Sequence, residues 1–178
     1  MVGVLWAAAA VLGLAGLAKL RHPEAAAAAV TAARLPWRPM LGTTIAMRSV
    51  GAAELAVALA VLGLGGRWPA LLLAAGYASL TVVAVRITRQ APTQPCGCLG
   101  NATQPISRGH LAVDIAGLTV GLTATVVPQP SLPALLTAAP GATAAVVIAA
   151  ALLTWLALLA MTALPELTRV RRAVENAG

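Results

Sequence analysis

Charged residues and cysteines are both scarce in this sequence of 178 residues. Only 10% of the residues are charged, five are Asp or Glu, and 60% are hydrophobic, with a mean hydropathy of +0.88. Soluble domains carry about 25% charged residues, so this composition excludes an ordinary soluble domain. Two cysteines are also too few for the disulfide framework of a small secreted domain.

Long apolar runs recur along the chain, and five of them are long enough to cross about 30 Å of hydrocarbon as a helix. The runs cover residues 2–20, 41–64, 68–88, 110–127 and 142–164. The sequence therefore predicts one all-α domain over residues 1–178, a polytopic transmembrane helix bundle in contact with membrane lipid. Residues 89–109 are predicted to be a loop that holds both cysteines, and residues 165–178 a basic tail.

Lysine and arginine give a net charge of +7, but they lie at the ends of the apolar runs. There they orient membrane helices, so no nucleic-acid partner is predicted. The first run is followed by its charges, Lys19 and Arg21, which is the reverse of a signal peptide. With the N-terminus outside, eleven Lys and Arg residues face inward and only Arg67 faces outward. We expect a multi-pass plasma-membrane protein whose C-terminus and cysteine loop lie on the cytoplasmic side.

Cys96 and Cys98 are separated only by Gly97, in the one long polar stretch of the chain. Prolines on both sides and Gly100 indicate a structured loop rather than a helix. A disulfide between residues i and i+2 requires a tight turn, which glycine permits. Such a short closed loop restricts the unfolded chain little, and strained disulfides are the labile or catalytic ones. The pattern favours a redox couple, while a thiolate metal site and two inert thiols remain open.

Glu54 and Asp114 place carboxyl groups inside the second and fourth runs. Glu54 is too short to reach the membrane surface, so it requires a partner or a proton. Lys19 and Arg48 are its candidate partners, and both a structural ion pair and a proton relay are open. Asp114 is shallower, and we expect it to cap the loop or to pair with Arg108.

All of these groups converge on one end of the expected bundle, which we interpret as the site. His22 and His110 flank the same end, either as interfacial residues or as further ligands to a thiolate-bound metal. The GxxxG pattern of Gly117 and Gly121 indicates close helix contact within the chain. Tyr77 and the four tryptophans are predicted to be packing or membrane-interface residues.

At four points the sequence resembles the MauE-type methylamine-utilisation membrane proteins, which are relatives of the DoxX group. Gly16-Leu17-Ala18-Lys19-Leu20 is similar to the family's glycine-and-lysine end of its first helix, and Glu54 to its acidic residue in the second. Cys96-Gly97-Cys98-Leu99-Gly100 resembles its Cys-Gly-Cys-Phe-Gly signature, and Arg108 its arginine before the next helix. The chain departs from the pattern at Leu99, in place of phenylalanine, and at Gly109, in place of asparagine.

The resemblance implies a four-helix antiparallel core with an additional C-terminal helix. It also implies thiol–disulfide exchange by Cys96 and Cys98 with a thioredoxin-like partner, in the maturation of a disulfide-containing exported protein. Glu54, Lys19 and Arg108 would shape the electrostatics of the couple. One dithiol serves one partner at a time, so a net reaction needs a second acceptor such as a quinone or another protein.

Two other functions remain open at this point. Paired thiolates suit soft metal ions, which would make the chain a metal-ion carrier or transporter with Cys96 and Cys98 as ligands. Alternatively, the chain is a non-catalytic assembly partner whose loop docks another membrane protein.

Overall fold

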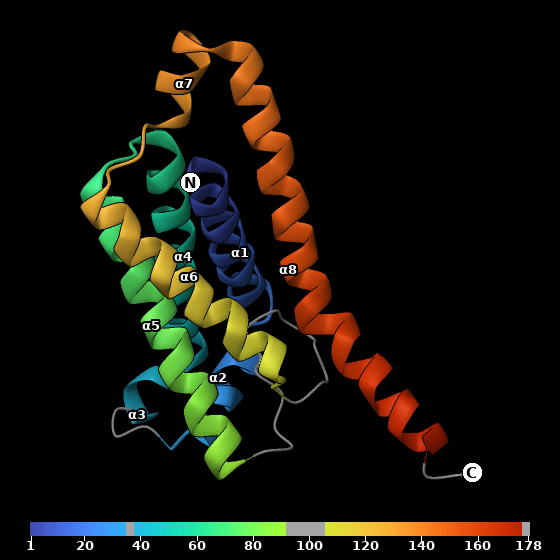
Figure 1. Ribbon diagram of the computed structural model, residues 1–178. Coiled ribbons are helices and arrows are strands. Elements are labelled where there is room, and N and C mark those ends of the chain that lie inside the picture. The colour runs from blue at the N-terminus through green and yellow to red at the C-terminus, as the bar shows by residue number, and fades with distance from the viewer. Residues whose placement is uncertain (35–37, 92–105, 176–178) are drawn as a thin grey trace.

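A computed structural model of the chain describes residues 1–34, 38–91 and 106–175 (Figure 1). These residues form eight helices, and no strand occurs among them. The helices are α1 (Val2–Arg21), α2 (Pro23–Ala32), α3 (Arg38–Leu41), α4 (Thr44–Gly63), α5 (Arg67–Gln90), α6 (Arg108–Val126), α7 (Leu132–Ala138) and α8 (Pro140–Glu175).

Five of the helices are long and apolar enough to cross a membrane: α1, α4, α5, α6 and the part of α8 from Pro140 to Ala163. The prediction of an all-α polytopic bundle is therefore confirmed. The helix ends follow local caps, because a side-chain oxygen at the N-terminus satisfies an otherwise unpaired N–H. Thr43 accepts a hydrogen bond from the Ala46 N–H at the start of α4, and Ser107 accepts one from the His110 N–H at the start of α6.

Helices α1, α4, α5 and α6 form an antiparallel bundle, and α8 lies against α1 and α6 (Figure 1). The most intimate pairs are α1 with α4 and α5 with α6. Between them lies an apolar core that includes Leu12 of α1, Val61 of α4, and Leu73 and Tyr77 of α5. This core fills the half of the bundle nearer α7.

The short helix α2 closes the other end of the bundle. Pro23 occupies its first turn, where the missing N–H costs no hydrogen bond. Its buried alanines and Val30 pack with Met47 of α4, Ile87 of α5 and Ile106, which precedes α6. This second apolar cluster lies where α1 ends and α4 begins.

Two segments differ from the expected organisation. The connection expected between residues 128 and 141 contains α7, which Ser131 caps by accepting from the Ala134 N–H. The segment expected as a basic tail continues α8 to Glu175. Helix α8 continues through Pro165, although a proline inside a helix removes one backbone hydrogen bond. Alanine and leucine, which are strong helix formers, precede this proline.

Candidate functional site

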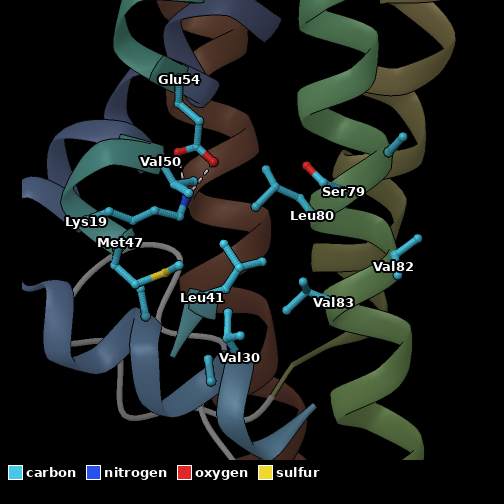
Figure 2. A pocket seen from close by; sticks show the side chains of 13 residues that line it. Lys19, Val30, Leu41, Met47, Val50, Glu54, Ser79, Leu80, Val82 and Val83 are labelled. Atoms are coloured by element: carbon cyan, nitrogen blue, oxygen red, sulfur yellow. Dashed lines mark hydrogen bonds and ion pairs between the residues drawn. The ribbon is translucent and has the colours of Figure 1, made fainter. Parts of the chain in front are cut away.

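Lys19 and Glu54 form an ion pair in the interior of the bundle (Figure 2). Lys19 Nζ donates to both carboxylate oxygens of Glu54, at 2.8 Å to Oε1 and 2.6 Å to Oε2. The two residues are only 5% and 8% exposed. Of the two partners that the sequence allowed for Glu54, the structure selects Lys19, whereas Arg48 lies exposed on α4. In the described part of the chain, no other ion pair joins two buried side chains.

Two glycines, about one helical turn before Lys19 and Glu54, let the backbones of α1 and α4 touch. This close contact brings the two charged side chains together. A Cβ on Gly16 would lie 2.6 Å from the Gly51 carbonyl oxygen, and a Cβ on Gly51 would lie 2.6 Å from that of Gly16. Small residues at a helix contact allow such backbone approach in membranes. Lys19 and Glu54 each follow their glycine by three residues, so both project from the same face of their helices. The repeated Gly-x-x-charge spacing is a signal that the sequence analysis missed.

A cavity of about 320 Å³ opens beside the ion pair. Its lining is almost entirely apolar, with Lys19 and Glu54 as its only charged residues among those described. The other lining residues come from four helices: Ala26, Ala29 and Val30 of α2, Leu41 of α3, Met47 and Val50 of α4, and Ala78, Ser79, Leu80, Val82 and Val83 of α5. Figure 2 shows the side chains of α4 facing those of α5 across this space.

Asp114 and Tyr77 extend the polar environment toward α5 and α6. Asp114 of α6 is 3% exposed. Tyr77 Oη donates a 2.8 Å hydrogen bond to the Ala8 carbonyl oxygen of α1. Its ring occupies the space in which Gly117 lacks a side chain, since a Cβ there would lie 2.5 Å from the ring. The interpretation of the GxxxG pattern as an intramolecular contact agrees with this packing.

Comparison with known proteins places the chain in a family. Residues 1–128 match the family model described as "Methylamine utilisation protein MauE". The chain belongs to the MauE family. The matched region contains α1 to α6, and thus the bundle, the ion pair and the cavity. No curated protein and no solved structure matches the chain.

The remaining candidate residues of this MauE-family chain are placed less centrally. Arg108 begins α6 and is exposed, and the ion pairs of the described residues do not include the expected pair between Arg108 and Asp114. The N-cap of α6 is Ser107, and Asp114 lies about two turns further along the helix. The expected contact of Asp114 with the cysteine loop falls outside the described residues. His110 is buried and His22 is half-buried near the exposed Glu24.

The cysteine loop lies largely outside the described residues. Cys96, Gly97, Cys98 and Gly100 all fall within residues 92–105. Its two flanks are described: Ala91 follows α5, and Ile106 packs against the apolar cluster of α2. The cysteine-bearing connection therefore attaches to the bundle at the end where α2 lies.

Three features lie at the same end of the bundle: a buried hydrogen-bond donor, an apolar cavity and the two flanks of the cysteine loop. The buried ammonium of Lys19 can donate a hydrogen bond to an acceptor in the cavity, because an ammonium has three N–H donors and Glu54 takes two. The apolar lining can hold a hydrophobic ring or chain. The two flanks of the cysteine loop attach to this same end.

Proposed function

We propose that this MauE-family protein is a membrane thiol–disulfide oxidoreductase in which Cys96 and Cys98 form the redox couple. The couple exchanges electrons with a thioredoxin-like partner and passes them to a second acceptor, a quinone or another protein. The process serves the maturation of a disulfide-containing protein. The proposal joins the reactive Cys-Gly-Cys sequence to the family membership of residues 1–128.

The observation that carries the proposal is the buried Lys19–Glu54 pair at the end of the bundle to which the cysteine loop is attached. Buried charges are costly in a membrane, and where they persist they mark functional pathways. Arg86, Arg89 and Arg108 flank the loop in the sequence, and cations near a thiol favour the reactive thiolate. Glu54, Lys19, Arg108 and Asp114 would thus support the couple rather than react themselves.

The exchange balances in electrons and protons with two reactants, the partner dithiol and the second acceptor. A dithiol of the partner attacks the Cys96–Cys98 disulfide through a mixed disulfide. The partner leaves as a disulfide, while Cys96 and Cys98 gain two electrons and two protons. The second acceptor then takes these two electrons and two protons and restores the disulfide.

The same proposal includes an orientation. The end of the bundle with α2, the ion pair and the loop flanks would face the cytoplasm of a plasma membrane, and α7 would face outward. Its support is the distribution of positive charge, because Arg67 at the start of α5 is the only Lys or Arg assigned to the α7 end.

The test is a redox titration of the purified protein in glutathione buffers of known potential, read by mass tagging of free thiols. We expect one reversible two-electron transition near cellular potentials, and we expect Cys96→Ser and Cys98→Ser each to abolish exchange with a partner. Accumulation of a mixed disulfide in one of the two serine variants would identify the attacking thiol. Thiols that stay reduced at every potential, or serine variants with full function, would overturn the proposal.

A metal-carrier role is the alternative, with Cys96 and Cys98 as the thiolate ligands. Among the residues that the structure describes, which do not include either cysteine, no three His, Cys, Asp or Glu side chains gather to hold a metal ion.

A further inference from the structure

We propose that the cavity beside the Lys19–Glu54 pair binds the ring of a membrane quinone, whose isoprenoid tail leaves between α4 and α5 into the lipid. This inference rests on the proposed function and deepens it, because it names the second electron acceptor and its place. It concerns only described residues, since the cavity is lined by α1 to α5.

The size and lining of the cavity suit such a ring. Its volume of about 320 Å³ falls at the lower end of the range of about 300–1,000 Å³ typical of small-molecule sites. Such sites are mostly apolar, with a few polar groups that fix the orientation of the ligand. Here Met47, Leu80 and Val83 supply apolar surface, and Lys19 and Glu54 supply the polar groups.

Lys19 gives the cavity a hydrogen-bond donor that a quinone carbonyl can use. Its ammonium bonds both oxygens of Glu54, which leaves one N–H of the three. A quinone ring carries two carbonyl acceptors and no donor, so it complements this site. The positive charge of Lys19 also favours the reduced ring, because electron density grows on the carbonyl oxygens as the ring accepts electrons.

The cavity is accessible from the lipid side of the bundle. Ser79 and Val82 line it and are exposed on α5, so one wall reaches the outer surface of the protein. Figure 2 shows Lys19 and Glu54 projecting toward this space from the side opposite α5. A ligand that diffuses in the bilayer can therefore reach the ammonium without crossing water.

A fatty-acyl chain is the competing occupant, and the ion pair argues against it. A hydrocarbon chain gains nothing from an N–H donor, and exposure of a charged pair to an apolar chain carries a desolvation cost. A quinone uses the same donor. The reaction balances: two thiols and a quinone give a disulfide and a quinol, so that two electrons and two protons move from sulfur to the ring.

Photoaffinity labelling tests the site directly. The full chain, in nanodiscs free of quinone, is labelled with an azidoquinone that carries a decyl tail, with decylubiquinone as competitor. We expect labelled peptides from α4 and α5 and saturable competition. Labelling that decylubiquinone does not reduce would overturn the proposal.

Two variants locate the ligand. Leu80→Trp places an indole in the cavity and should weaken competition by about tenfold or more, while Leu72→Trp, on an exposed face of the same helix outside the cavity, should leave it unchanged. The double variant Lys19→Met/Glu54→Leu keeps the site apolar and uncharged, and should also weaken competition by about tenfold, the loss of one charge-assisted hydrogen bond. If the double variant binds the quinone normally and a photoreactive alkyl lipid labels the cavity equally, the occupant is an acyl chain and the proposal is wrong.

The serine variants separate this inference from the proposed function. Cys96→Ser/Cys98→Ser should still bind the azidoquinone competitively and should fail to reduce decylubiquinone. A reversible thiol titration without competitive quinone labelling would overturn the proposed quinone site but not the proposed oxidoreductase function. Reduction of decylubiquinone by the double serine variant would show that the cysteines are not the redox couple, and would overturn the proposed function.

Discussion

At the scale of single residues, Lys19 and Glu54 place two opposite charges in the bundle interior, and each charge depends on the other. Each charge alone would be stranded in apolar surroundings, and the hydrogen bonds of 2.8 and 2.6 Å compensate both at once. The cost of burying the pair is met only while both partners are present. The two residues therefore act as one unit in any mutational experiment.

We expect Lys19→Met alone to lower the free energy of unfolding by about 3–5 kcal/mol, because it leaves the Glu54 carboxylate buried without its cation. Lys19→Met/Glu54→Leu should be close to the parent protein, since apolar side chains of similar volume replace both charges. Thermal denaturation in detergent micelles, followed by circular dichroism, measures both variants. A single variant as stable as the parent would show that Glu54 is not held by Lys19.

The sequence predicted the need for a partner at Glu54, because a carboxylate at that depth cannot reach the surface. It did not choose between Lys19 and Arg48, since the choice depends on how α1 crosses α4. The cavity was not predictable at all. Its lining residues, such as Val50 and Leu80, belong to the same residue types as the packed core, and only the fit of side chains decides where space remains.

At the scale of elements, glycines set the distances between helices. Gly16 and Gly51 bring α1 against α4, and Gly117 and Gly121 bring α6 against α5, where a Cβ on Gly121 would lie 2.9 Å from the Ala74 nitrogen. Both contacts pair helices that are adjacent in the bundle. The cavity lies on the less intimate side, between α4 and α5.

Gly51→Ala should therefore destabilise the protein by about 1–3 kcal/mol, the usual cost of overpacking, and should lengthen the Lys19–Glu54 contact. Gly63→Ala in the same helix is the matched control. A Cβ at Gly63 would have no neighbour within 4 Å, so that variant should be neutral or slightly stabilising. Equal loss of thermal stability in both variants would contradict a specific contact between α1 and α4.

Five membrane spans followed from apolar length alone. The short helix α2 has a local signal as well, because Pro23 in its first turn and the alanines after it are typical of a helix start. Helix α7 was not predicted, because its seven residues lie in an uncharged, proline-rich stretch that resembles an ordinary connection. The full length of α8 also escaped prediction. Charged residues and a proline after an apolar run indicate the membrane surface, but α8 continues past both Pro165 and the first arginines.

At the scale of the whole molecule, the two ends of the bundle differ in chemistry. One end carries α2, the ion pair and both flanks of the cysteine loop. The other carries α7, and the turn between α4 and α5 with Arg67 as its charge. This asymmetry is what gives the molecule a direction in a membrane.

Cysteines introduced into a Cys96→Ser/Cys98→Ser background test that direction. Thr137→Cys in α7 should react with a membrane-impermeant maleimide from the outside of sealed cells, because its side chain is exposed. Ala28→Cys, exposed on α2, should react only after the membrane is permeabilised. The reverse pattern of labelling would place the cysteine loop outside the cell and overturn the proposed orientation.

The order in which the ribosome makes the chain suits the ion pair. Lys19 is synthesised first, and its long side chain can keep its ammonium at the membrane surface until the second membrane helix has been made. Glu54 follows 35 residues later, and its side chain is too short to keep its carboxylate at the membrane surface. When the second membrane helix enters, its acid meets a cation that is already beside it. A chain with the acid first and the cation second would have to insert an unpaired carboxylate.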